Sequence, residues 1–424
     1  MKHSEYSPRI IDPMVERYLK TFGAVCLEGP KWCGKTWTSS EHSASEFYVG
    51  DPAGNFQNRQ LAELEPATVL KGDQPRLVDE WQEVPALWDA VRFEVDQTRK
   101  KGQFILTGSS TPRQKGVLHS GTGRIARLRI RPMSLYEMGL SSGEVSLESL
   151  CHGTLATNLS NPTELKTLAE MVIRGGWPES INMPISQASI IPKEYLKAVI
   201  ENDVDRADGK TRNKHKVELL LRSLARNEST VVTNKTLKKD IKEEDDEDID
   251  IDTVAEYLDV FERLFLIENQ KPFSTNIRSG IRVKKQEKRH FCDPSLACAL
   301  LNATPEMLIG DLNTFGFLFE AMVERDLRIY AESFDAQLYH YQNYRNQEID
   351  AVIELQDGNW CAFEIKLGAN QIDSAASGLI QISKDIQDEN GKAPTVLGII
   401  CGTANAAYKR PDDVFVVPIT MLKN

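Results

Sequence analysis

Residues 24–37 read AVCLEGPKWCGKTW, and this stretch decides the fold of the N-terminal part of the chain. An apolar run, AVCL, leads into a loop with glycines at positions 29 and 34, and a helical pattern begins at Lys35 and Thr36. Glycines let a loop wrap so that successive backbone N–H groups point toward one centre, where the N-terminus of the following helix adds partial positive charge. This spacing between a strand and a helix therefore predicts a loop that binds the phosphates of a nucleotide.

Two side chains of this loop have predicted roles in binding ATP and Mg²⁺. Lys35 would reach the β- and γ-phosphates, and Thr36 would ligate the metal. Trp32 either packs in the core or stacks near a base, and Cys33 is either an inert small side chain or a redox-sensitive thiol. The predicted nucleotide-binding residues of the loop are Gly29, Pro30, Lys31, Trp32, Cys33, Gly34, Lys35 and Thr36.

Two further strand ends supply candidate groups for hydrolysis. The run RLVDEWQ at 76–82 ends its apolar part with Asp79, predicted to ligate Mg²⁺ or its water, and Glu80, predicted to polarise the attacking water. The run FILTGSS at 104–110 places Ser109 where a hydroxyl can bond the γ-phosphate or the lytic water. Thr107 either shares that role or belongs to a Gly-Ser turn.

Short apolar runs alternate with helical patterns from residue 23 to residue 131, which predicts a parallel sheet with helices on both faces. After Pro132 the pattern turns helical. Three short helices are then predicted between residues 217 and 267, followed by a basic stretch suited to a two-stranded wing. The predicted fold class is therefore a multidomain α/β protein.

These motifs resemble the AAA-type ATPases of the branch that includes the signal-transduction STAND ATPases. The stretch GTGRIARLRIRPMSLYEMG at 121–139 and the stretch RGGWPES at 174–180 extend the likeness. The resemblance implies that Pro178 packs on adenine and that Arg124 is an arginine finger, acting in cis or in trans. The alternative for Arg124 is a surface ion pair, because arginines on solvated strands are common.

The chain also resembles a family of uncharacterised bacterial and archaeal proteins that join such an ATPase to a C-terminal domain of unknown function. LEGPKWCGKT, VDEWQEVP, ILTGSS and RGGWPE occur in the family's order, and the likeness covers essentially the whole chain. Together with the helical patterns above and the C-terminal residues described next, it predicts four domains: a P-loop AAA-type ATPase core at 1–140, a helical lid at 141–210, a winged-helix-like domain at 211–292 and a PD-(D/E)xK nuclease-like domain at 293–424.

The C-terminal part contains a second candidate site in NQEIDAVIELQDGNWCAFEIKLG, residues 346–368. A hairpin would bring Asp350 beside Glu364 and Lys366, which share one face of a strand. Glu320 lies on an amphipathic helical pattern and needs a partner if it is buried. This arrangement resembles the metal site of PD-(D/E)xK nucleases, in which Gln381 also matches a glutamine of some branches. The alternative is a non-cutting relic of that fold.

DNA binding by the winged-helix-like segment competes with a structural role. The basic stretch includes Arg278, Arg282, Lys284, Lys285, Lys288 and Arg289 and suits contact with a phosphate backbone. The acidic run EEDDEDIDID at 243–252 would repel phosphate as the chain enters the third helix, which favours a structural or interaction role.

Composition limits the functional classes. The chain has 424 residues, enough for two or three domains, and a net charge of −11, so bulk charge gives no sign of nucleic-acid binding. Scattered cysteines, no apolar leader and no membrane-length apolar run predict a cytoplasmic protein with no membrane partner. The sequence predicts an ATPase whose nucleotide state repositions the nuclease-like domain, with oligomerisation possible. The alternatives are an ATP-gated metal-dependent nuclease or nucleic-acid-binding effector, and a slow-turnover signalling or scaffold module with a protein partner.

Overall fold

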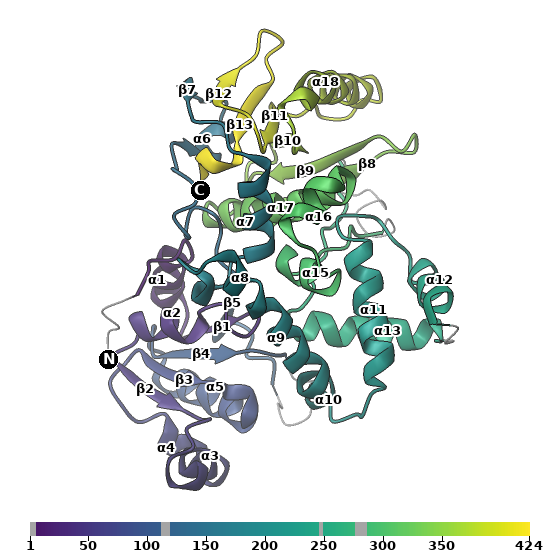
Figure 1. Cartoon of the computed structure of the whole chain (residues 1–424). Coiled ribbons are helices and arrows are strands. Elements are labelled where there is room, and N and C mark those ends of the chain that lie inside the picture. The colour runs from purple at the N-terminus through teal and green to yellow at the C-terminus, as the bar shows by residue number, and fades with distance from the viewer. Residues whose placement is uncertain (1–5, 112–118, 246–248, 276–285) are drawn as a thin grey trace. The chain divides into compact units, whose positions relative to one another are not determined.

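The glycine-rich loop follows β1 (Ala24–Glu28), an inner strand of a five-stranded parallel sheet (Figure 1). The computed structural model describes residues 6–111, 119–245, 249–275 and 286–424. Its contacts divide the chain into two units, each considered by itself. The first unit comprises Met1–Pro132, Glu201–Arg212 and Asp259–Leu266, and the second comprises Met133–Ile200, Asn213–Leu258 and Ile267–Asn424.

The strands of the first unit run in the order β2-β3-β4-β1-β5, and every pairing is parallel. Because all the strands run in one direction, the loops after them gather at a single edge of the sheet. The strands are β1 (Ala24–Glu28), β2 (Ser45–Tyr48), β3 (Arg76–Asp79), β4 (Phe104–Gly108) and β5 (Ile125–Arg129). The helices are α1 (Asp12–Thr21), α2 (Lys35–Glu41), α3 (Ala53–Leu64), α4 (Pro66–Val69), α5 (Ala86–Thr98) and α10 (Val204–Arg206), with the 3₁₀ turn η1 (Trp81–Glu83).

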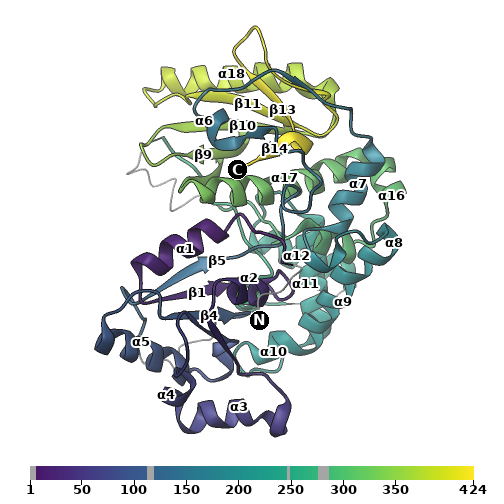
Figure 2. The same ribbon diagram turned by 90° about the vertical axis from the view of Figure 1, so that its left-hand side faces the viewer.

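Strand β1 is apolar along its length because both of its faces are covered. Ala24 and Cys26 pack in a core with α5, whereas Val25 and Leu27 pack on the opposite face with α1. Figure 2 shows α1 and α5 on opposite sides of this sheet. The prediction of a parallel sheet with helices on both faces is confirmed for this unit.

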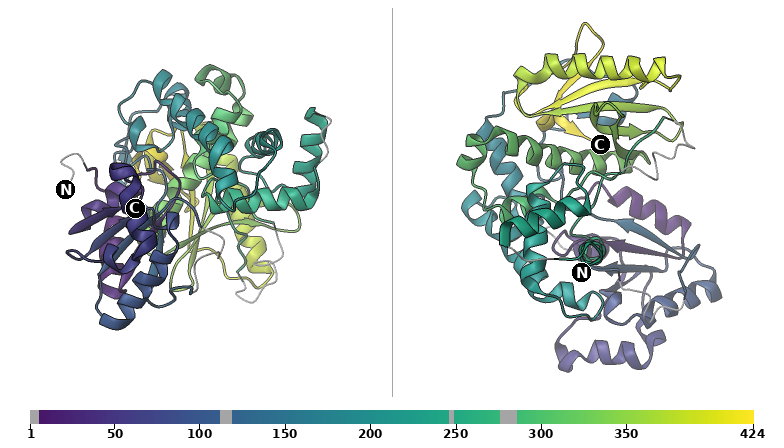
Figure 3. Two further views of the ribbon diagram at one scale, coloured as in Figure 1. Left: turned by 90° about the horizontal axis from the view of Figure 1, so that it is seen from below. Right: turned by 90° about the vertical axis from the view of Figure 1, so that its right-hand side faces the viewer.

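The second unit contains a seven-stranded mixed sheet in the order β7-β12-β13-β11-β10-β9-β8 and a small two-stranded sheet, β14-β6. Helix α18 (Ile372–Asp388) covers one face of the large sheet and α17 (Leu312–Ser333) the other (Figures 2 and 3). The strands are β6 (Val145–Ser146), β7 (Asn158–Leu159), β8 (Gln337–Gln342), β9 (Glu348–Glu354), β10 (Trp360–Lys366), β11 (Val396–Cys401), β12 (Ala406–Lys409), β13 (Phe415–Pro418) and β14 (Leu422–Lys423).

The remaining helices of the second unit occur in the sequence between β6 and β8. They are α6 (Leu147–Cys151), α7 (Leu165–Arg174), α8 (Ile185–Ala188), α9 (Ile190–Ala198), α11 (Lys214–Arg226), α12 (Asn234–Asp245), α13 (Ile251–Arg263), α15 (Pro294–Leu300) and α16 (Pro305–Gly310), of which α13 ends in the first unit. Short 3₁₀ turns are η2 (Pro178–Ser180), η4 (Ala369–Gln371) and η5 (Ile419–Met421), and η3 (Val199–Asp203) is a π-helix that begins in the second unit and ends in the first. None of the helices in the described parts of the chain is long and apolar enough to cross a membrane.

The three helices α11, α12 and α13 occur where the sequence predicts helices of a winged-helix-like domain. Antiparallel bridges join Ile267 to Phe291 and Gln270 to Lys288, as at the base of a two-stranded wing. The predicted wing residues Arg278, Arg282, Lys284 and Lys285 lie outside the described residues, as does part of the acidic run. The winged-helix interpretation stays a prediction.

Two short strands depart from the prediction of a purely helical lid at 141–210. Strand β6 pairs with β14, and β7 pairs with β12, so each joins a strand from the C-terminal end of the chain. Each consists of two residues, which is too short for the alternation of apolar and polar side chains that reveals a strand. Residues 145–146 and 158–159 therefore each contribute one short strand to the C-terminal sheets.

Candidate active site

The phosphate-binding loop is shaped by its two glycines. A Cβ atom at Gly29 would lie 2.1 Å from the carbonyl oxygen of Ile130, so no side chain fits there. Gly34 precedes α2 with a φ of 98°, in the left-handed region that glycine adopts without strain. The loop therefore passes tightly over the end of the sheet and turns its backbone into the N-terminus of α2.

Lys35 and Thr36 lie at the start of α2 and point into the unit. The Nζ atom of Lys35 donates a hydrogen bond of 2.7 Å to the carbonyl oxygen of Pro30, and the side chain is buried. The hydroxyl of Thr36 donates a bond of 2.9 Å to the Oδ1 atom of Asp79. The partner in this bond is a neutral backbone carbonyl rather than a carboxylate. The bond therefore leaves the positive charge of the Lys35 ammonium group uncompensated.

The ends of β3 and β4 bring the predicted hydrolytic groups to the same edge. We call Lys35, Thr36, Asp79, Glu80, Thr107 and Ser109 the edge cluster. The hydroxyl of Thr107 donates to Asp79 Oδ1 at 2.7 Å and accepts from the backbone N–H of Glu80 at 2.9 Å. The hydroxyl of Ser109 donates to Glu80 Oε2 at 2.9 Å. The hydrogen bonds of both carboxylates in this cluster thus come from neutral groups.

Glu80 has an unusual backbone conformation. Its φ is 56° and its ψ is 48°, a left-handed geometry that a glutamate adopts only when its surroundings impose it. The amide of Gln82 donates to the Glu80 carboxylate and lies 3.2 Å from the Ser109 hydroxyl. Sequence reasoning missed Gln82, whose signal is a polar residue two positions beyond the glutamate. Together these contacts aim the Glu80 carboxylate from a rigid turn.

The residues present fit a magnesium ion. Burial raises the pKa of Asp79 above its ordinary value, and the hydroxyls of Thr107 and Thr36 act against that rise. Carboxylate and hydroxyl oxygens are the ligands that Mg²⁺ takes in proteins, and Asp79 and Thr36 present one of each within hydrogen-bonding distance. A carboxylate buried against two hydroxyls gains a stronger partner when a cation binds.

The side chains between the two glycines of the loop differ in their surroundings. Lys31 forms an ion pair of 2.7 Å with Asp203 at the end of η3, within the first unit. Trp32 is 57% exposed with a φ of 63°, so the prediction of core packing is wrong. The loop turns at this residue and directs the indole outward. Cys33 is fully buried, as expected of a small packing side chain.

Arg124 lies at the opposite edge of the sheet from the loop. It immediately precedes β5, whose first residue is in register with Ala24 at the beginning of β1. The five residues of β1 span roughly 16 Å before the loop starts. The guanidinium pairs with Asp96 of α5 at 2.6 Å, and the side chain is 48% exposed. The structure therefore does not bring Arg124 to the loop of its own chain.

Arg9 is a loop contact that sequence reasoning missed. Its guanidinium donates to the carbonyl oxygens of Cys33 and Arg131, both at 2.8 Å, and the residue is buried. A buried arginine that bonds two backbone carbonyls fixes the loop against the segment that follows β5. The only sequence signal is a single arginine before the first helix, which no spacing rule connects to the loop.

The stretch around Pro178 has a structural explanation in the second unit. The carboxylate of Asp293 accepts from the backbone N–H of Gly176 at 2.8 Å, and Trp177 donates to Ser295 at 2.9 Å. A Cβ atom at Gly175 would lie 2.3 Å from Asp293, so the glycine is required by this packing. Pro178 begins η2 in this unit, so its contact with adenine stays a prediction.

The second unit gathers the predicted nuclease-like residues, together with a lysine that the prediction did not include among them. We call Lys288, Glu320, Asp350, Glu364 and Lys366 the tail cluster. Lys366 Nζ lies 3.1 Å from Asp350 and 2.5 Å from Glu364, and Lys288 Nζ lies 2.5 Å from Glu320 and 3.9 Å from Asp350. Every carboxylate of the cluster therefore has an ammonium partner.

The charged groups of the tail cluster shift one another's pKa values. Burial and the nearby charge of Asp350 raise the pKa of Glu364 to about 8, although Lys366 opposes the rise. Burial also raises the pKa of Glu320 to about 7 against the effect of Lys288. Burial alone would raise the pKa of Asp350, but Lys366 and Lys288 hold it below its ordinary value. The two lysines thus stabilise the carboxylate between them.

These residues do not fit the metal that the nuclease resemblance implies. Among the residues that the structure describes, no group of three or more histidine, cysteine, aspartate or glutamate side chains is arranged to hold a metal ion. The matching glutamine, Gln381, is exposed on α18 and bonds Asp385 at 2.8 Å. The predicted convergence of Asp350, Glu364 and Lys366 is present, but it is an ion-pair network.

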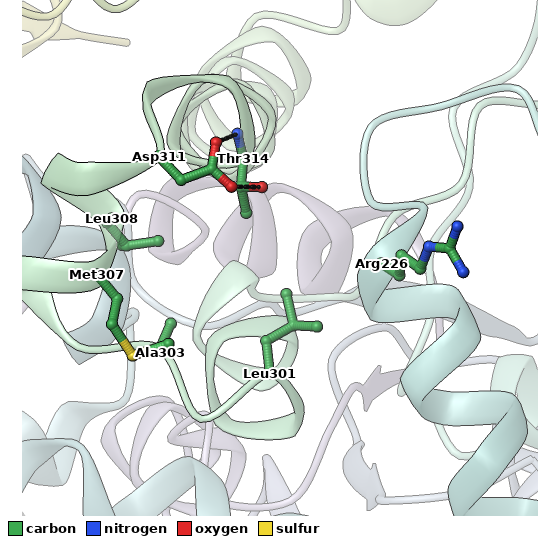
Figure 4. A pocket seen from close by; sticks show the side chains of 7 residues that line it. All are labelled: Arg226, Leu301, Ala303, Met307, Leu308, Asp311 and Thr314. Atoms are coloured by element: carbon green, nitrogen blue, oxygen red, sulfur yellow. Dashed lines mark hydrogen bonds between the residues drawn. The ribbon is translucent and has the colours of Figure 1, made fainter. Parts of the chain in front are cut away.

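A pocket of about 220 Å³ in the second unit contains neither cluster (Figure 4). Arg226 of α11 borders it opposite Met307, Leu308 and Thr314. The carboxylate of Asp311 accepts from Thr314 at 3.1 Å and 2.6 Å, as the N-terminal cap of α17. Helix capping therefore explains why the pocket contains the acidic residue Asp311.

Comparisons with known proteins give three family matches along the chain. Residues 21–139 match a family described as AAA domain, residues 165–307 match Domain of unknown function (DUF8612), and residues 315–422 match Domain of unknown function (DUF4143). No curated protein matches the chain.

Solved structures resemble parts of the chain at low identity. The Walker-type ATPase PABY2304 of Pyrococcus abyssi is 11% identical, with a TM-score of 0.43, over 71% of this chain and 97% of that one. The replication initiator DnaA bound to AMPPCP and single-stranded DNA is 13% identical, with a TM-score of 0.28, over 60% and 86%. The Aeropyrum pernix ORC1 protein in complex with DNA is 12% identical, with a TM-score of 0.24, over 73% and 96%.

The family match at residues 21–139 coincides with the parallel sheet and its glycine-rich loop. Residues 21–139 of this chain therefore match an AAA domain and contain the glycine-rich loop of a P-loop fold.

Proposed function

We propose that the first unit binds ATP with Mg²⁺ and hydrolyses it. The observation that carries the proposal is the edge cluster, in which two carboxylates and three hydroxyls from α2 and the ends of β3 and β4 meet beside the buried Lys35. The glycine-rich loop and the N-terminus of α2 supply backbone N–H groups for the phosphates. The groups proposed to bind the phosphates and to activate water therefore lie at one edge of the sheet.

Each residue has one task in this proposal. Lys35 exchanges its bond to the Pro30 carbonyl for a phosphate oxygen. Thr36 and Asp79 hold Mg²⁺, which neutralises charge on the phosphates when it is bound. Glu80 accepts a proton from the attacking water, and Ser109 orients that carboxylate through its hydroxyl.

Arg124 is proposed to act in trans on the nucleotide of a neighbouring copy, because it is half-exposed and far from its own loop. Replacing it with alanine should lower turnover by ~10³-fold with little change in ATP binding. Mixing the Arg124→Ala and Lys35→Ala proteins should restore part of the turnover, since each would supply what the other lacks. Wild-type turnover in Arg124→Ala alone would leave Arg124 as the structural partner of Asp96.

The finer assignments complete the proposal. The ATPase belongs to the STAND-like branch and Pro178 contacts adenine. The four domains have the boundaries expected from the sequence, except that β6 and β7 of the 141–210 segment pair with C-terminal strands. The winged-helix-like segment has a structural or interaction role, and the C-terminal domain has a PD-(D/E)xK-like fold that nucleotide binding repositions. Seven free, buried cysteines support a reducing, cytoplasmic location. Oligomerisation is part of the proposal, since a finger in trans requires it.

The alternatives differ in one measurement. An ATP-gated nuclease or nucleic-acid-binding effector requires a tail that cuts or binds nucleic acid, and a scaffold requires little turnover. ATP hydrolysis by the full chain with Mg²⁺, with and without DNA or RNA, separates them. Turnover abolished by Glu80→Gln supports the proposed ATPase. Retained ATP binding without turnover in the wild type favours the scaffold, and DNA or RNA cleavage favours the nuclease.

A further inference from the structure

The position of Lys288 has a consequence for the tail cluster that does not depend on ATP hydrolysis. Its ammonium group lies between Glu320, at 2.5 Å, and Asp350, at 3.9 Å. The side chain of Lys288 is 3% exposed, and those of Glu320 and Asp350 are 12% and 10% exposed. The ammonium group of Lys288, with its single positive charge, is thus enclosed between two carboxylates.

The backbone holds this ammonium in place. Lys288 and Gln270 exchange both backbone hydrogen bonds at 2.9 Å. The side-chain amide of Gln270 donates to the carbonyl oxygens of Asp350 and Tyr339, at 3.0 Å and 2.9 Å. The segment that carries Lys288 is therefore connected directly to β9, the strand that carries Asp350, and to β8.

We propose that Lys288 is the resident cation of the tail cluster and that its ammonium group excludes divalent metal ions from these carboxylates. A magnesium ion bound to Glu320 and Asp350 would need oxygen atoms at about 2.1 Å and would occupy the space that Nζ of Lys288 fills. Lys366 already partners the other side of Asp350 and Glu364, at 3.1 Å and 2.5 Å. Two lysines offset two of the three carboxylates, so the cluster has little charge left to attract a divalent ion.

Binding of a metal would first require Lys288 to leave. Moving a buried ammonium away from its carboxylates is unfavourable unless it reaches water, and the two backbone hydrogen bonds to Gln270 restrain the backbone that would have to shift. The metal-free state of the cluster is thus built into the chain. On this basis the C-terminal domain keeps the geometry of a nuclease-like fold without its metal chemistry.

Calorimetric titration with Mn²⁺ tests this directly on the full, nucleotide-free chain. The wild type and Asp350→Asn should give the same binding isotherm, because neither holds a metal at the tail cluster. Lys288→Met keeps an unbranched side chain that is one atom shorter and removes the charge and the Nζ atom, so it should gain a Mn²⁺ site with at least a tenfold lower dissociation constant than any site of the wild type. The double variant Lys288→Met, Asp350→Asn should lose that gain.

Lys271→Met is the matched control, because Lys271 is an exposed lysine of the same region and its loss should not create a site. Circular dichroism and hydrogen exchange at the amides of β9 and β10 verify that each variant is folded around the tail cluster. Two results would overturn the proposal: Mn²⁺ binding by the wild type that Asp350→Asn removes, or a folded Lys288→Met protein that gains no site. If Lys288→Met does not fold, the comparison of the wild type with Asp350→Asn still decides.

Discussion

The edge cluster and the tail cluster contain similar groups but use them in opposite ways. In the edge cluster, Lys35 bonds a carbonyl oxygen and the hydrogen bonds to Asp79 come from hydroxyls, so the hydrogen-bond partners of its charges are neutral. In the tail cluster, Lys366 bonds Asp350 and Glu364, so charge is cancelled within the chain. A ligand can replace a neutral partner at small cost, whereas it must break an ion pair to enter the second cluster.

The comparison teaches that convergence of acids and lysines does not by itself identify a metal site. What matters is which partner each charge already has. The edge cluster leaves its charges available for phosphate and Mg²⁺, and the tail cluster does not. The predictions below test this difference.

The largest expected effect is on catalysis by Glu80. Glu80→Gln should lower ATP turnover by about 10²–10⁴-fold and leave ATP binding intact, because it removes only the group that accepts the proton from water. The matched change in the tail cluster, Glu364→Gln, should leave turnover unchanged. Steady-state phosphate release, paired with titration of a fluorescent ATP analogue, measures both. Equal losses in the two variants would contradict the division of roles.

The next effect concerns stability. Asp350→Ala leaves Lys288 and Lys366 buried with a partner missing, which should cost about 3–5 kcal/mol. Asp79→Ala removes a carboxylate bonded by hydroxyls and should cost about 1 kcal/mol. Hydrogen exchange at the amides of β9 and β10 in Asp350→Ala, compared with those of β1 and β3 in Asp79→Ala, reports each unit separately. Similar losses of protection would show that the tail cluster is no more tightly paired than the edge cluster.

Nucleotide affinity gives a third test. Lys35→Ala should raise the dissociation constant for ATP by about 100-fold, because a charged hydrogen bond to phosphate is lost. Lys31→Ala is the control, since its side chain pairs with Asp203 and its backbone N–H is retained. Undiminished affinity in Lys35→Ala, or an equal loss in both variants, would refute the assignment of the loop.

A fourth test is the pH dependence of stability. The carboxyl group of Glu364 has a pKa of about 8 in the folded chain, above the value of about 4.3 for an unfolded glutamate. Its contribution to stability is fully present below the unfolded pKa and is lost as the pH rises through 8.

Glu364→Gln cannot lose this proton, so its Tm relative to the wild type should rise from pH 5 to about pH 8 and then level off. Thermal unfolding across this range measures the change, with Glu306→Gln, a substitution of an exposed glutamate, as the control. A Tm difference that is constant with pH would mean that Glu364 titrates normally.

Local patterns were sufficient to predict the glycine-rich loop and the strand-end groups of the first unit. The glycine-rich loop, Asp79, Glu80 and Ser109 each follow an apolar strand, and the rule that parallel strands end at one edge predicts their meeting. The chain order of these motifs was therefore enough to anticipate the edge cluster. The sequence also placed Asp350, Glu364 and Lys366 together, because a hairpin and a period of two residues determine that contact.

Only the tertiary structure decided which partner each charge has. Arg9 meets the loop through Cys33, although 24 positions separate them, and Lys288 meets Glu320 across 32 positions. Helix and strand periodicity does not predict contacts between residues so far apart in the sequence, because these contacts depend on how the segments pack in the folded chain. The sequence by itself determined the phosphate loop, the strand-end acids and the convergence of the tail residues. Packing alone decided that Arg124 lies far from its own loop and that a lysine occupies the centre of the tail cluster.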